Sequence, residues 1–96
     1  MQFEWDEKKR KINLKEHKID FDVVISVFKE NRCKLKRWDK RGYEGEEREI
    51  TIGMIDDGRI VVVVHVDRGE NIRIISARKA TQKERKIYYA HCAKIY

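Results

Sequence analysis

Hydrophobic and polar positions alternate most regularly in the second half of the chain. At residues 50–54, isoleucine and methionine at every second position alternate with threonine and glycine, which predicts a strand with one buried face. Residues 59–67 carry apolar side chains at both odd and even positions, from Ile60 to Val64 and at Val66, and predict a central strand that is covered on both faces. Residues 71–77 predict a third strand. Because the turn signals Asp56-Asp57-Gly58 and Arg68-Gly69-Glu70 separate these segments, we expect an antiparallel meander of three to four strands.

The register of the third strand follows from its apolar positions. Placing Ile72 and Ile74 on the same face as Val64 requires a connection with an odd number of residues. This register would bring Arg73 to the opposite face, close to His65.

Three other segments carry helix patterns. Residues 6–17 are rich in helix formers and begin with Asp6, a residue that often caps helix N-termini. Residues 20–28 place apolar side chains at helical spacing but contain many β-branched residues, so a strand stays open there and helix is favoured. Thr81-Gln82-Lys83-Glu84 is a capping box that predicts a C-terminal helix. The apolar stripe of that helix is formed by Ile87, Tyr88, His91 and Ile95.

The order of these elements indicates an α+β fold with two N-terminal helices, the meander and a C-terminal helix. A chain of 96 residues without proline or a flexible linker is expected to form a single domain, residues 1–96. The charged fraction of 42% lies well above the roughly 25% of ordinary domains, so the core must be concentrated in a few segments.

Net charge favours an acidic partner. The chain carries a formal charge of +6 and has a pI near 9.4. Basic residues are concentrated at 7–18 and 29–41, whereas residues 44–57 are acidic. We therefore expect a basic face that attracts nucleic acid, an anionic membrane or an acidic protein.

Metal, cofactor and targeting motifs are not recognisable in the sequence. Cys33 and Cys92 form neither a C-x-x-C pair nor a zinc spacing, and we expect both to be reduced thiols. The N-terminal residues 1–10 contain no apolar signal segment, and the apolar run at 60–64 is too short to cross a bilayer. The expected location is cytoplasmic, with no cofactor and no membrane contact.

Two blocks of the sequence resemble a known family. The first, F-E-W-D-x-x-K-x-x-x-N-x-x-x-H-x-I-x-F, is similar to the opening of the BrnT toxin family, and it comprises Phe3-Glu4-Trp5-Asp6, Lys9, Asn13, His17, Ile19 and Phe21. The second is similar to the central and C-terminal signature of that family, and it comprises Gly45-Glu46-Glu47-Arg48, Ile52-Gly53, Asp57-Gly58-Arg59, residues 72–81, Glu84-Arg85 and Tyr88. Residues 29–44 lie outside the resemblance.

The resemblance implies a bacterial type II toxin, a ribonuclease with a RelE-like fold. It also implies a BrnA-type antitoxin with a ribbon-helix-helix region as partner, RNA as substrate, and operator DNA bound only through the antitoxin. This chain departs from the family pattern at two positions, where Glu16 replaces a basic residue and Lys18 replaces a glycine. The missing glycine removes an easy left-handed stop after the helix that ends at His17.

A ribonuclease of this kind needs a group that moves protons and cations that stabilise the phosphate. His17 is the first candidate for proton transfer because it stands at the histidine position of the family, although a histidine that caps the helix end is the alternative. His65 is a rival that could equally be a core residue, and His91 is expected to be structural. Metal-independent attack by the RNA 2′-OH would leave a 2′,3′-cyclic phosphate.

Arginines are the candidates for holding the phosphate, because a guanidinium donates two parallel hydrogen bonds. Arg48 and Arg78 complete the predicted catalytic set, and for Arg48 a surface network with neighbouring glutamates stays open. We expect RNA to be bound by Lys9, Arg73, Arg85 and Trp38. Trp38 and Tyr43 could stack on bases, whereas solvated helix faces or loops are the alternative for the basic runs.

Two alternative functions remain open at this point. The chain could be a non-catalytic nucleic-acid-binding module that relies on its basic runs. It could also be a partner-binding protein whose toxic activity has decayed, which the unusual residues 29–44 suggest.

Overall fold

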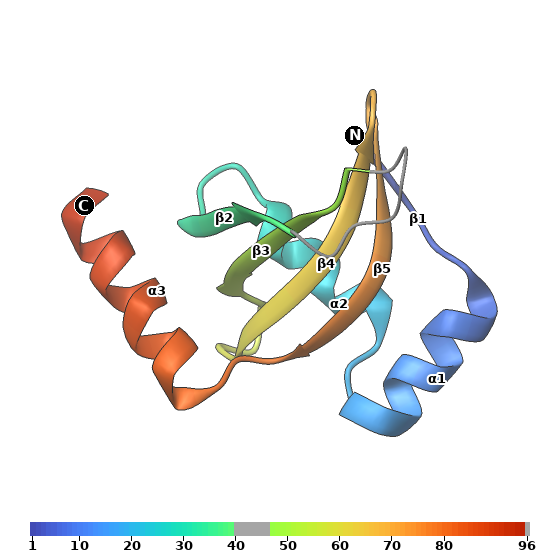
Figure 1. The fold of residues 1–96 in the computed structure, drawn as a ribbon, viewed down its shortest axis with the longest axis horizontal. Coiled ribbons are helices and arrows are strands. Elements are labelled where there is room, and N and C mark those ends of the chain that lie inside the picture. Colours follow the sequence, from blue (N-terminus) through green and yellow to red (C-terminus); the bar gives the residue numbers. More distant parts are fainter. Residues whose placement is uncertain (40–46, 96) are drawn as a thin grey trace.

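A five-stranded sheet organises the part of the chain that the computed structural model describes, residues 1–39 and 47–95 (Figure 1). The order across the sheet is β1-β5-β4-β3-β2. The strands are β1 (Gln2–Glu4), β2 (Lys34–Trp38), β3 (Glu49–Met54), β4 (Ile60–Arg68) and β5 (Asn71–Lys79). β1 pairs with β5 in parallel, and the other neighbouring strands are antiparallel. The predicted α+β class and the antiparallel meander of three to four strands, formed by β2 to β5, are therefore confirmed.

Helices precede and follow the meander. They are α1 (Glu7–His17), α2 (Phe21–Val24), the 3₁₀ helix η1 (Ile25–Phe28) and α3 (Gln82–Ile95). The segment at 20–28 is helical, as favoured, but it divides into α2 and η1. The capping box also forms, because the Glu84 amide donates to Thr81 Oγ1 and the Thr81 amide donates to a Glu84 oxygen.

The sequence pattern did not reveal the two edge strands. β1 has three residues, which is too short for an alternation to show, and it pairs in parallel with β5. β2 has the sequence Lys-Leu-Lys-Arg-Trp, so only its second and last residues are apolar. Such a strand supplies the hydrogen bonds of the neighbouring strand, and its lysine and arginine side chains keep the outer edge of the sheet solvated.

The two faces of the sheet are packed differently. We call the face of β4 with Val61 and Val63 the α2 face, because it packs against α2 and η1 in a core that also contains Ile19, Phe21, Val24, Val27, Ile55, Ile74 and Ala77. We call the opposite face, with Val62 and Val64, the α3 face. A smaller cluster there joins the sheet to α3 and consists of Ile52, Ile60, Val62, Ala80 and Tyr88.

The predicted register between β4 and β5 is wrong. The connection between Arg68 and Asn71 has two residues, and an irregularity at Val64/His65 shifts the later pairs by one residue. As a result Ile74 pairs with His65, and Arg73 pairs with Val66. Arg73 therefore does not share the face of His65.

The two cysteines are joined in a disulfide, so the prediction of reduced thiols is wrong. Cys33, just before β2, and Cys92, in α3, have Cα atoms 5.9 Å apart although 59 residues separate them in sequence. Their spacing in sequence did not predict the bond, because the two cysteines meet only once the sheet has brought the start of β2 next to α3. The Tyr88 hydroxyl donates to the Cys33 carbonyl at 3.0 Å and reinforces this attachment.

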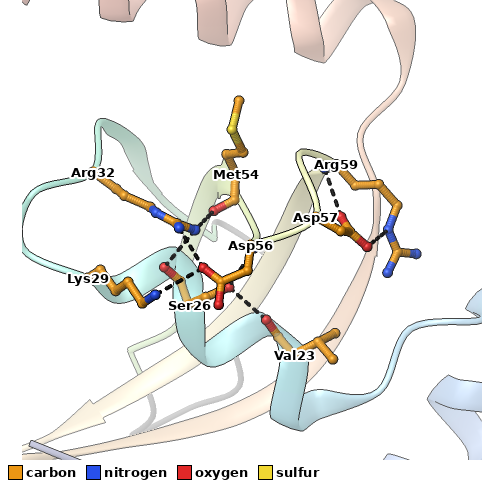
Figure 2. A network of polar contacts seen from close by, with 8 residues as sticks. All are labelled: Val23, Ser26, Lys29, Arg32, Met54, Asp56, Asp57 and Arg59. Atoms are coloured by element: carbon orange, nitrogen blue, oxygen red, sulfur yellow. Dashed lines mark hydrogen bonds and ion pairs between the residues drawn. The ribbon is translucent and has the colours of Figure 1, made fainter.

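Figure 2 shows a polar network that fixes η1 to the turn between β3 and β4. The Asp56 carboxylate accepts a hydrogen bond from Lys29 Nζ at 3.0 Å and another from the Arg32 guanidinium. Arg32 donates to the Met54 carbonyl at 3.0 Å, and the Asp56 amide donates to Ser26 Oγ at 3.1 Å. Part of the acidic segment is thus neutralised by the basic segment at 29–41.

No helix among the described residues has the length and apolar character to cross a membrane.

Candidate active site

His17 and Arg78, two of the predicted catalytic residues, line one cavity on the α3 face. The cavity has a volume of about 110 Å³. Its walls come from the end of α1 and from β3, β4 and β5, and consist of His17, Ile50, Val62, Val64, Ser76, Ala77 and Arg78. Apolar side chains of β3 and β4 form part of the wall, and the polar groups stand on β5 and at the end of α1. Residues that are 61 positions apart in sequence are therefore brought to the same site.

The end of α1 is held against β5 by Asn13, which is buried. Its amide nitrogen donates to the Ile19 carbonyl at 2.9 Å, and its amide oxygen accepts from the Ala77 amide at 3.1 Å. β1 pairs with only three residues of β5, Asn71 to Arg73, and Ala77 lies beyond them. The Asn13 oxygen therefore supplies the hydrogen bond that the Ala77 amide needs. The next turn of α1 carries His17, so Asn13 fixes the distance between His17 and β5.

Lys18 ends α1 in the left-handed conformation that is usual for glycine. Its φ and ψ are 59° and 28°, and its amide donates to the Leu14 carbonyl at 3.0 Å. The helix stop that the missing glycine put in doubt is therefore present with lysine. His17 is exposed, and its ring makes no hydrogen bond to any residue of the described ranges.

Arg78 stands on β5 and is held by Glu84. The Arg78 side chain lies on the α3 face because its Cα partner is Val62. Its Nη1 and Nη2 donate to the two Glu84 oxygens at 2.7 and 2.9 Å. The hydrogen bonds from Arg78, supported by the Thr81 amide, lower the pKa of Glu84 to about 2. The same pair raises the pKa of Arg78, so the guanidinium stays charged.

The third predicted catalytic residue, Arg48, lies directly before β3. Side chains alternate along a strand, so Arg48 emerges on the face of Ile50, which is the α3 face. It is half-buried and has interaction partners of its own. Arg48 therefore shares the face of His17 and Arg78 but is not among the residues that line their cavity.

The predicted RNA-binding residues are distributed around the molecule. Arg73 is on the α3 face opposite Val66, with its guanidinium 4.0 Å from Glu4. Lys9 is exposed on α1, and Arg85 is exposed on α3 with Nη1 donating to the Ala80 carbonyl.

Trp38 lies apart from this group. It is 64% exposed and is the Cα partner of Glu49, which places it on the α2 face, away from His17 and Arg78. Tyr43, the other predicted stacking residue, lies outside the described residues.

His65 has no access to solvent. Its Nε2 is 2.7 Å from Thr51 Oγ1, and its Nδ1 is 2.9 Å from Asp67 Oδ1. This hydroxyl-imidazole-carboxylate order is that of a catalytic triad. However, both Thr51 and His65 are fully buried, so a substrate could not reach them. Burial also lowers the pKa of His65 against the opposing effect of Asp67, which favours a neutral ring.

Two polar residues near the cavity were not predicted. Ser76 pairs with Val64 and stands two residues before Arg78, so both side chains lie on one face of β5. Strand alternation could have identified it. Glu84 was predicted as a helix cap and as part of the resemblance but not as a partner of Arg78, because the bidentate bond depends on how α3 folds back.

The chain matches, over residues 5–84, the family described as ribonuclease toxin, BrnT, of type II toxin-antitoxin systems. Among solved structures, the Brucella abortus ribonuclease toxin BrnT is similar, with a TM-score of 0.57 and 26% sequence identity. The match covers 85% of this chain and 99% of that chain. No curated protein sequence matches the chain. The chain therefore belongs to the BrnT family of ribonuclease toxins, and a type II system implies an antitoxin partner.

Proposed function

We propose that this chain is an endoribonuclease toxin that cleaves RNA without a metal ion, through His17 and Arg78. The observation that carries the proposal is that both residues line one cavity. The exposed His17 ring has no hydrogen-bond partner among the described residues, and Arg78 is held by Glu84. An imidazole moves protons near neutral pH, and a guanidinium stabilises the charge that develops on phosphate. Arg48 and Arg73, on the same face, would bind the flanking phosphates.

The reaction is an in-line displacement at phosphorus. His17 accepts the proton of the RNA 2′-OH while the 2′ oxygen forms a bond to phosphorus. The bond from phosphorus to the 5′ oxygen breaks, and this oxygen takes up a proton from water. Arg78 donates to the non-bridging oxygens as their charge grows. The products are a 2′,3′-cyclic phosphate and a 5′-hydroxyl end.

The test is cleavage of an RNA oligonucleotide by the purified chain, with the Arg78→Ala and His17→Ala variants measured beside it. We expect Arg78→Ala to lower kcat about 100-fold or more, which is typical for the loss of one donor to a developing oxyanion. The product ends identify the chemistry, and chelation by EDTA should leave the rate unchanged.

Arg59→Ala is the matched control, because it removes the same charge. Arg59 binds Asp57 at 2.8 Å in the turn between β3 and β4 and does not line the cavity. A folded Arg78→Ala variant that cleaves RNA as fast as Arg59→Ala would overturn the catalytic role of Arg78.

A binding module is the second candidate function, and the ion pair of Arg78 with Glu84 favours it. A guanidinium with Nη1 and Nη2 bonded to a carboxylate has fewer donors for phosphate. In that case Arg78→Ala and Arg59→Ala would weaken RNA binding equally, and no cyclic phosphate would form. Growth arrest on induction of the chain in a bacterial host, with new 5′-hydroxyl RNA ends, would exclude this candidate.

For the antitoxin we propose a BrnA-type ribbon-helix-helix protein that covers the α3 face. The exposed side chains of Arg37, Arg78 and Arg85 give this face and its rim a basic character that an acidic segment could match. Operator DNA would then be bound by the antitoxin and not by this chain. A complex that still binds RNA as tightly as the free toxin would contradict this arrangement.

A further inference from the structure

Three potential metal ligands meet on the α2 face, across the sheet from His17 and Arg78. Glu49 and His65 are Cα partners on β3 and β4, and Asp67 follows His65 by two residues on the same face. One ligand atom from each of the three side chains lies within 4.8 Å of the others. The cluster therefore lies at the last residue pair of β3 with β4 and includes side chains from both strands.

The protein bonds of this cluster leave one carboxylate oxygen unsatisfied. His65 is bonded on both nitrogens, to Thr51 and to Asp67. Glu49 Oε2 is buried and has no hydrogen-bond partner within the described structure. A buried carboxylate oxygen without a partner carries a large desolvation cost, and a bound cation would compensate for it.

We propose that Glu49, His65 and Asp67 bind one divalent transition-metal ion, for which Zn²⁺ is the best fit. One imidazole nitrogen and two carboxylate oxygens form a three-ligand set that Zn²⁺ accepts, with water in the fourth position. Mg²⁺ and Ca²⁺ prefer oxygen ligands alone, so the imidazole favours a transition metal.

The surroundings of the cluster suit this ion. Asp67 is 43% exposed in its side chain, which gives the ion a route from solvent and leaves room for the water. The ion would take the place of the contact between His65 Nδ1 and Asp67. Thr51 Oγ1, bonded to Nε2, would then orient the ring from the outer side, as the second partner of a metal-bound histidine commonly does.

A metal at this position would cross-link β3 and β4 and stabilise the folded chain. The sheet separates it from the cavity of His17 and Arg78, so the ion would take no part in RNA cleavage. This inference does not rest on the proposed function, and its test does not involve RNA.

The test is titration of the purified chain with Zn²⁺ by calorimetry, and with Co²⁺ by visible absorption. The disulfide is kept intact, without reductant, so that no thiol competes for the metal. We expect one ion per chain, a Tm that rises with Zn²⁺ concentration, and Co²⁺ bands typical of a four-coordinate site. Glu49→Gln and Asp67→Asn should each weaken binding at least tenfold.

Asp57→Asn is the control, because it removes an exposed carboxylate from the turn between β3 and β4 and should leave the affinity unchanged. Asp67→Asn is the decisive variant, since the exposed position of Asp67 allows the chain to fold without its charge. The absence of saturable binding would overturn the proposal, as would wild-type affinity in both ligand variants.

Discussion

The α2 face and the α3 face of the sheet differ in how completely they are covered. On the α2 face, Phe21 and Val63 are fully buried, and α2 with η1 packs over them. On the α3 face, Tyr88 of α3 is buried against the sheet, but Val64 is only half-buried, and Arg78 keeps 44% of its side chain exposed. The centre of the α2 face, around Phe21 and Val63, is therefore packed so that it excludes solvent, whereas the α3 face keeps a cavity beside Val64 and Arg78.

The largest test of this comparison is truncation of one apolar side chain on each face. Phe21→Ala should lower the free energy of unfolding by about 4 kcal/mol, because it opens a cavity in a fully packed core. Val64→Ala should cost about 1 kcal/mol, since its side chain is partly hydrated already. Urea unfolding of both variants provides the measurement. Equal costs would show that the two faces are packed alike.

Removing the disulfide tests how strongly α3 is held to the α3 face. Replacing Cys33 and Cys92 by serine should lower the free energy of unfolding by about 3 kcal/mol, because the unfolded chain loses a long covalent loop. Amide hydrogen exchange should accelerate in α3 more than in α1.

A reductant supplies the control for this experiment. It should destabilise the wild type by a similar amount and leave the double serine variant unchanged. If the reductant had no effect on the wild type, the disulfide would contribute nothing to stability.

Sequence reasoning predicted the elements whose determinants are local. The Asp6 cap forms as expected, with Oδ1 accepting from the Lys8 amide at 2.8 Å, and the Thr81 capping box forms as well. The alternation at 50–54 and the apolar run at 59–67 correspond to β3 and β4. Each of these features depends on residues within a few positions of one another.

The features that the sequence did not reveal depend on contacts between distant residues. The pairing of Cys33 with Cys92, 59 residues apart, arises from how α3 folds back, and their spacing in sequence does not encode it. The irregularity next to His65 moved Arg73 to the other face, although the alternation of β5 was recognised. Of the predicted site residues, His17 was chosen from the resemblance and Arg78 from guanidinium chemistry, and both line one cavity. The strand register places Trp38 on the other face.

Burial of His65 on the α2 face makes the stability of the fold depend on pH. Burial lowers the pKa of His65, so the unfolded chain takes up this proton at a higher pH than the folded chain. The contribution is complete above the ordinary pKa near 6.5 and is lost as the pH falls toward the folded pKa, by at most about 1.4 kcal/mol per unit. Urea unfolding between pH 7.5 and 5.5, where carboxylates stay largely ionised, measures this slope.

NMR of the histidine ring protons assigns the effect to its source. The His65 signal should remain that of a neutral ring at pH values where free imidazole is protonated. A flat stability profile in the wild type would contradict the burial argument.

The smallest expected change in stability is at Lys18, which ends α1 directly after His17. Its left-handed backbone, with φ at 59°, is unfavourable for a side chain with a Cβ atom and costs roughly 1 kcal/mol. Lys18→Gly should therefore raise the free energy of unfolding by about 1 kcal/mol, while Lys15→Gly, inside α1, should lower it by a similar amount. Because the Lys18 amide already bonds to Leu14, the glycine variant should keep the position of His17 and, with it, the RNA cleavage rate. Faster unfolding of Lys18→Gly would mean that the lysine side chain itself stabilises the end of α1.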